Sequence, residues 1–92
     1  MDQLSLLWTD YLRYRADLRG FSLDRIEEIV RYSGERYRDE LTGRIVVIGT
    51  HGDSLVMIPY EIQDETIVPV TIHATSRQQI ELRLKSGRFL HE

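Results

Sequence analysis

The chain has 92 residues, with 12 Lys and Arg, 15 Asp and Glu, and a formal net charge of −3. A chain of this length forms one domain, residues 1–92, and buries only about 60–65% of its unfolded surface, so we expect marginal stability or a stabilising partner. Without cysteine it has no disulfide framework, thiolate zinc site or thiol nucleophile. No apolar run approaches the roughly 20 residues of a membrane-spanning helix, so we expect a cytoplasmic globular protein without a membrane segment.

Charge is unevenly distributed along the chain. Residues 11–38 carry seven Arg against five acidic residues, and residues 77–88 carry four basic residues against one. Residues 39–66 carry six acidic residues and a single Arg. Eleven of the twelve basic residues are Arg, the side chain suited to bidentate phosphate contact. A mixed solvated surface and a bipolar molecule with one anion-binding side both remain open.

Two helices are predicted in the first third of the chain. Apolar residues recur every three or four positions in the first, which predicts one apolar helical face and an end at Gly20. That face contains Leu4, Leu7, Trp8, Tyr11, Tyr14 and Leu18. Ser22 is a good N-cap for the second helix, which ends at Gly34. Residues 35–43 are polar and are predicted to be a connection.

Three strands are predicted next. The ranges Arg44–Thr50, Leu55–Ile62 and Thr66–Ala74 are rich in Val and Ile and are separated by short turns. This pattern predicts an antiparallel meander. Pro59 and Pro69 cannot donate hydrogen bonds to a neighbouring strand, so each is expected at an open edge or a bulge.

A third helix follows the strands. Ser76 begins a capping-box pattern, the helix extends through about Ser86, and Gly87 ends it. The predicted fold class is therefore α+β, with the element order ααβββα.

Both faces of the predicted meander are apolar. If Gly52-Asp53 and Asp64-Glu65 are two-residue turns, pairing assigns the strand residues to two faces. One face holds Val46, Ile48, Leu55, Met57, Val68, Val70 and Ile72, and the other holds Ile45, Val47, Val56, Ile58, Tyr60, Ile62, Ile67, Thr71 and His73. Two helices cover one side and the short third helix only part of the other, which leaves an exposed apolar patch. We therefore expect a homodimer or a hetero-oligomer with a partner protein.

The junction between the third strand and the last helix carries the strongest candidates for chemistry. His73 suits a general acid/base; the alternative is a strand-end histidine bonded to a backbone carbonyl. Arg77 lies in the first helical turn, where its guanidinium and the backbone N–H groups can hold one phosphate; the alternative is an i,i+4 pair with Glu81. Arg83 and Arg88 either add positive potential or are solvated.

Other motifs give weaker signals. Arg13-Tyr14-Arg15 and Arg36-Tyr37-Arg38 interleave cations with rings, as single-stranded RNA binders do. Tyr14 is assigned to the apolar helical face, whereas Tyr37 has no such assignment. The three His are at positions 51, 73 and 91, on separate elements and without Cys or Asp at metal-ligand spacing, so no metal is predicted, and no cofactor is predicted either.

Short motifs at both ends resemble a known family. Trp8-Thr9-Asp10, followed by Arg19-Gly20-Phe21-Ser22 and an amphipathic helix, resembles the opening of BrnT-type toxins. Related small proteins close with a pattern similar to His73-Ala74-Thr75, Arg77-Gln78-Gln79-Ile80 and Gly87-Arg88-Phe89. The resemblance implies a RelE-like fold and the toxin component of a bacterial type II toxin–antitoxin module. Family members often have His where Arg19 stands here, and they tend to be more basic than this chain.

The activity implied by the resemblance is that of a metal-independent ribonuclease acting on RNA phosphodiesters, neutralised by a co-encoded antitoxin. In this hypothesis His73 is the acid/base residue and Arg77 holds the scissile phosphate, while Arg19, Arg83 and Arg88 are supporting RNA-binding charges. The rival hypothesis is a non-enzymatic protein-interaction domain, dimeric through its open sheet face, in which these Arg residues only solvate the surface.

Overall fold

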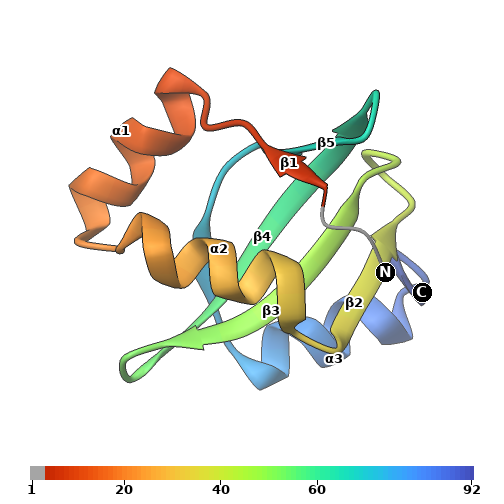
Figure 1. The fold of residues 1–92 in the computed structure, drawn as a ribbon. Coiled ribbons are helices and arrows are strands. Elements are labelled where there is room, and N and C mark those ends of the chain that lie inside the picture. Colours follow the sequence, from red (N-terminus) through yellow and green to blue (C-terminus); the bar gives the residue numbers. More distant parts are fainter. Residues whose placement is uncertain (1–3) are drawn as a thin grey trace.

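The structure is a computed structural model, and it describes residues 4–92. It is a mixed α/β arrangement with helices on both faces of one sheet (Figure 1). The elements in chain order are β1 (Ser5–Leu6), α1 (Asp10–Arg19), α2 (Leu23–Tyr32), β2 (Glu35–Asp39), β3 (Ile45–His51), β4 (Ser54–Gln63), β5 (Thr66–Pro69), β6 (His73–Thr75), α3 (Arg77–Lys85) and β7 (Phe89–His91). Within the described residues, no helix is long and apolar enough to cross a lipid bilayer.

The sheet is larger than the sequence predicts. It has seven strands in the order β1-β5-β4-β3-β2-β7, and β6 pairs with β4 beyond the end of β5. Only the β1–β5 pair is parallel among the described strand pairs. The predicted ααβββα order with a three-stranded meander is therefore wrong, and so is the RelE-like outline stated with it. The polar segment 35–39, predicted as a connection, forms β2 because Tyr37 and Asp39 alternate into the interior.

The two predicted hairpin turns are confirmed. His51 pairs with Ser54 across Gly52-Asp53, and Gln63 pairs with Thr66 across Asp64-Glu65. Asp64 and Glu65 have φ values of 50° and 64°, the left-handed conformation that a type I′ turn requires at both central residues.

The predicted third strand is divided by a bulge. Tyr60 of β4 pairs with Pro69, and Met57 pairs with His73, so three steps along β4 oppose four steps along the other chain segment. Because of the extra residue, the side chains after the bulge point to the opposite face of the sheet from the one predicted. His73 consequently shares a face with Met57 rather than with Tyr60, and Ile72 packs into the opposite core, which corrects the predicted placement of both residues.

Two apolar clusters hold the helices on the sheet. Helices α1 and α2 cover one face, and α3 covers the other (Figure 1). The first cluster contains Leu12, Ala16, Ile26, Ile29, Val30, Val47, Val56, Ile58, Tyr60, Ile67 and Ile72. The second contains Tyr37, Val46, Ile48, Ile80 and Phe89. The face predicted to be partly open is covered by α3 and Phe89, since Val46 and Ile48 are each only 1% exposed.

Helix α1 turns a different face to the core than predicted. Thr9 is the N-cap and accepts a hydrogen bond from Leu12 N at 3.0 Å, so residues 4–8 precede the helix and do not extend its apolar face. Leu12 and Ala16 are buried instead. Four residues predicted to be inward are largely exposed, namely Leu7, Tyr11, Tyr14 and Leu18 at 53%, 56%, 60% and 60%.

Candidate anion-binding site

His73 lies where the two layers of helices meet the edge of the sheet. It begins β6, whose only pairing among the described strands is with β4. Arg15 reaches this edge from α1, and its Nη2 lies 3.2 Å from His73 Nδ1. The same Nη2 donates to the Ile72 carbonyl at 3.3 Å. Arg15 therefore connects helix α1 to the start of β6.

This contact fixes the protonation of the imidazole. A guanidinium has only donors, so Nδ1 of His73 accepts and the neutral ring carries its proton on Nε2. Burial lowers the pKa of His73 below 6.5, and the positive charges of Arg15, Arg19 and Arg83 lower the pKa further. The ring is consequently neutral at pH 7 and presents an N–H donor at Nε2.

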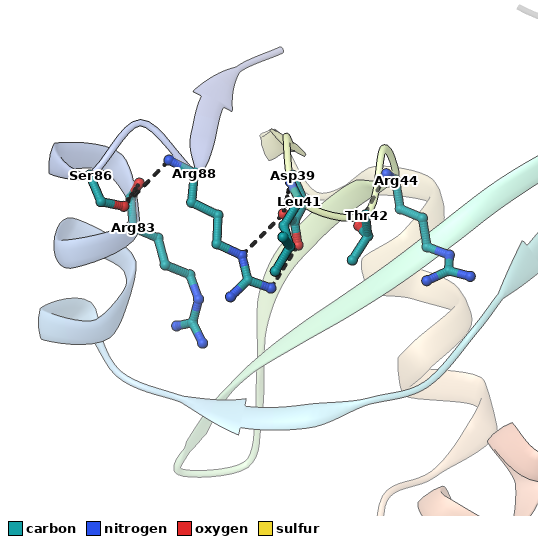
Figure 2. A network of polar contacts seen from close by, with 7 residues as sticks. All are labelled: Asp39, Leu41, Thr42, Arg44, Arg83, Ser86 and Arg88. Atoms are coloured by element: carbon teal, nitrogen blue, oxygen red, sulfur yellow. Dashed lines mark hydrogen bonds and ion pairs between the residues drawn. The ribbon is translucent and has the colours of Figure 1, made fainter.

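Three arginines lie close enough to His73 to lower its pKa, and none of them is paired with a carboxylate of the described residues. Arg19 follows Arg15 by one turn of α1, and Arg83 extends from α3 toward β6 (Figure 2). The guanidinium of Arg83 lies over the Phe89 ring, 5.7 Å from its centroid. Within residues 4–92, none of the three forms an ion pair, and Nε of Arg15 is buried without a hydrogen-bond partner. Positive charge is therefore concentrated at this edge.

Arg77 has a different neighbour from the one its sequence spacing suggests. Its Nη1 forms an ion pair with Oε2 of Glu35 at 2.6 Å, not with Glu81. Tyr37 OH donates to the same Glu35 oxygen at 2.6 Å. Burial raises the pKa of Tyr37 and the Glu35 carboxylate raises it further, to about 12. Arg77 is thus paired within the protein, and its charge is not among those that act on His73.

Arg88 is also paired within the protein. Its Nε and Nη2 each lie 3.1 Å from one carboxylate oxygen of Asp39, and Asp39 is only 4% exposed (Figure 2). Burial alone raises the pKa of Asp39, but hydrogen bonds from Arg88 and from the backbone N–H groups of Leu41 and Thr42 outweigh it, so the pKa lies below 3.8. This geometry links β2 to the residue before β7 and occupies both oxygens of the carboxylate.

The structure thus brings together three of the five predicted site residues, His73, Arg19 and Arg83. It adds Arg15, which sequence reasoning missed. The signal for Arg15 was the Arg13-Tyr14-Arg15 motif, discounted because Tyr14 was assigned to the core. Tyr14 is exposed, whereas Tyr37 of the other motif is buried and stacked on Phe89 with ring centroids 5.4 Å apart. The tyrosine assigned to the core is therefore the exposed one, and the unassigned tyrosine is in the core.

A pocket of about 500 Å³ lies elsewhere, between the end of α2 and β4. Its walls are mainly apolar, and two arginines, Arg31 and Arg36, line it. Arg31 donates to Glu27 Oε2 at 2.8 Å and to the Leu4 carbonyl at 2.7 Å. Arg36 donates to the Val30 and Ser33 carbonyls and to Tyr60 OH at 2.6, 3.1 and 2.9 Å, so all three guanidinium nitrogens are occupied. This pocket therefore lacks the available donors that the His73 edge offers.

Among the described residues, no group of three or more His, Asp or Glu side chains is placed to hold a metal ion. Comparison with protein-family models, with curated proteins and with solved structures finds no match for this chain.

Proposed function

We propose that this protein binds RNA through its phosphate backbone and cleaves it, as the toxin component of a bacterial type II toxin–antitoxin module with a co-encoded antitoxin. One observation carries the RNA-binding part of the proposal. Arg15 contacts a neutral imidazole at the sheet edge, Arg19 and Arg83 lie near enough to lower its pKa, and none of the three has a carboxylate partner within residues 4–92.

The chemistry of this group selects an anion. Guanidinium groups and the Nε2–H of His73 are all donors, so a ligand must supply acceptors. Phosphate oxygens accept charge-assisted hydrogen bonds, and arginine suits them because its planar fork contacts two oxygens at once. The net charge of −3 repels RNA as a whole, so attraction has to come from the positive charge concentrated at this edge.

Cleavage imposes a further requirement on Arg15. In a metal-independent reaction the 2′-oxygen bonds to phosphorus, the P–O5′ bond breaks, and water protonates the departing oxygen. The 2′-hydroxyl proton passes to a base, and His73 offers a lone pair only when Arg15 leaves Nδ1. Movement of Arg15 from Nδ1 onto the phosphate would free that base and neutralise the transition state together. Binding needs no such movement, so binding and cleavage are tested separately.

The binding test compares arginines with and without a partner. Arg15→Ala and Arg83→Ala are expected to weaken binding of a labelled single-stranded RNA about tenfold each, because each removes a charged hydrogen-bond donor. Each should also lower the slope of log affinity against log salt by roughly 0.7, the value for one lost phosphate contact on a single strand. The matched control is Arg44→Ala, since Arg44 is paired with Glu61 at 2.8 Å. Equal losses in all three variants, or none, would refute the site.

The cleavage test uses expression of the chain alone while growth and total RNA are followed. We expect growth arrest and RNA decay, both lost in His73→Ala. Purified His73→Ala should still bind RNA through its arginines. Intact RNA after incubation with folded wild-type protein would refute the ribonuclease activity and leave the binding result standing.

A second candidate function is that of a protein-interaction domain. The observation that favours it is the exposure of two leucines, Leu7 before α1 and Leu18 on α1, which are 53% and 60% exposed. Leu7→Ser/Leu18→Ser is expected to dissociate such an assembly in sedimentation experiments. A monomeric wild-type protein that binds RNA argues against this candidate.

A further inference from the structure

The outer face of α1 carries two tyrosines without ring partners. Tyr11 and Tyr14 are 56% and 60% exposed. Within residues 4–92, the ring contacts involve other side chains, and neither tyrosine hydroxyl is hydrogen-bonded. The rings of Tyr11 and Tyr14 are therefore accessible to a ligand.

Tyr11 is aligned with the cationic site. Tyr11, Arg15 and Arg19 are spaced by four residues on α1, so they form one row along the helix surface. Side chains four apart have Cβ atoms about 5–6 Å from each other. Tyr11 consequently adjoins Arg15, whose guanidinium contacts His73, and Tyr14 lies three residues further along the same face.

We infer that Tyr11 and Tyr14 stack unpaired bases of an RNA strand whose phosphate lies among Arg15, Arg19, Arg83 and His73. Each nucleotide joins an aromatic base to a phosphate, and the Tyr11–Arg15 row offers a ring beside a guanidinium. The ligand is therefore single-stranded RNA, because the bases of a duplex are stacked on each other and cannot reach a tyrosine. This inference rests on the RNA binding proposed above and adds the class of RNA.

Charge favours RNA over a protein as the occupant of this face. Arg15 and Arg19 lie in the same row of α1 as Tyr11, and neither has a carboxylate partner within residues 4–92, whereas the acids of the helix, Asp10 and Asp17, lie beside Tyr14. A protein that covered the apolar residues would bury these cations unless it supplied matching acids. RNA brings a negative charge with every base that it stacks.

The experiment measures binding of three labelled probes to the full chain: a single-stranded RNA, the same sequence as a duplex, and an abasic ribose-phosphate strand. Tyr11→Ala should weaken binding of the single strand about 5- to 100-fold, the range for one lost base stack. Its salt slope should stay unchanged because no phosphate contact is lost. Tyr14→Ala should also weaken binding of the single strand, and Tyr11→Phe, which keeps the aromatic ring, should bind it as tightly as the wild type. The matched control is Tyr32→Ala, an exposed tyrosine on α2 that should have no effect.

The outcomes separate this inference from the proposed function. If Arg15→Ala weakens binding and the tyrosine variants do not, the stacking inference fails while RNA binding stands. If the duplex or the abasic strand binds as tightly as the single strand, the inference also fails. If no variant changes RNA binding, both fail. If Tyr11→Ala changes only the sedimentation of the protein, the face is a protein interface and the inference is overturned. Melting temperatures of the tyrosine variants should match the wild type, because both side chains are exposed.

Discussion

At the residue scale, a carboxylate partner separates the structural arginines from those available to a ligand. Arg77 and Arg88 carry the positive charge nearest to Glu35 and Asp39, and each joins an element of the C-terminal segment to β2. Arg15, Arg19 and Arg83 have no such partner within the described residues. Acidic residues occur near both the paired and the unpaired arginines in the sequence. Sequence spacing therefore does not tell the two groups of arginines apart, and only the tertiary structure does.

The Asp39–Arg88 pair is expected to stabilise the fold. Arg88→Ala leaves a carboxylate that is 4% exposed without its main donor. A buried charge left in this way costs roughly 1–3 kcal/mol of the free energy of unfolding, measurable by urea denaturation. The control is Arg38→Ala, whose contact with Glu92 is longer, at 3.9 Å, and more exposed. A loss no larger than the control's would show that the pair adds nothing.

The same pair predicts a pH dependence. The folded-state pKa of Asp39 lies below 3.8, so the unfolded state binds its proton more readily. The stabilisation is therefore complete above pH 3.8 and is lost as the pH falls through the folded-state pKa. Asp39→Asn should flatten the decline of unfolding free energy on acidification below about pH 4. An unchanged decline would contradict this assignment.

At the element scale, α2 packs against β3 without space for a further methyl group. A Cβ added at Gly49 would lie 2.6 Å from Cγ2 and 2.8 Å from Cγ1 of Ile29. Gly49→Ala is expected to lower the free energy of unfolding by about 1–3 kcal/mol through overpacking. The cost should shrink in an Ile29→Ala background, which a double-mutant cycle measures. Gly34→Ala is the control because no heavy atom lies within 4 Å of its added Cβ. An additive cycle would show that this contact is not the cause.

Elements set by local signals could be predicted from the sequence. Ser22 and Ser76 cap their helices as expected, accepting from Arg25 N and Gln79 N at 3.1 and 3.2 Å. The two-residue turns also follow from their residues. Strand β2 could not be predicted, because its alternation is hidden among charged residues and its pairing with β3 and β7 is long-range. The bulge before His73 leaves no local pattern, so the face of His73 was wrong.

The candidate site was only partly accessible to sequence reasoning. His73 and Arg15 are 58 residues apart, and no spacing rule connects a residue of the first helix to one of β6. The exposed face of α1 was mistaken for its buried face because apolar spacing alone does not distinguish a buried face from an exposed one. Arg19 and Arg83 were predicted as supporting charges of the RNA site, and the fold supplies their proximity to His73.

At the scale of the whole molecule, the site joins both helical layers across the sheet edge. Arg15 and Arg19 come from α1, and Arg83 comes from α3 on the opposite face. Protonation of His73 therefore changes the contact between the two helical layers and also the affinity for an anion bound at this edge. In the RNA complex proposed above, protonation of His73 would therefore couple stability to RNA binding.

This coupling predicts opposite effects of acid on the free and the bound protein. Because the folded-state pKa of His73 lies below 6.5, the unfolded state binds more protons, so the contribution of His73 is present above pH 6.5 and is lost as the pH falls. A phosphate beside the ring favours the imidazolium, so RNA binding takes up a proton and strengthens on acidification. Single-stranded RNA should therefore raise the melting temperature more at about pH 5.5 than at about pH 8. His73→Gln cannot titrate and should remove this difference while retaining the arginine-dependent shift. Equal pH dependence in the wild type and His73→Gln would exclude His73 from the RNA site, since other groups, such as His51, are unchanged in the variant.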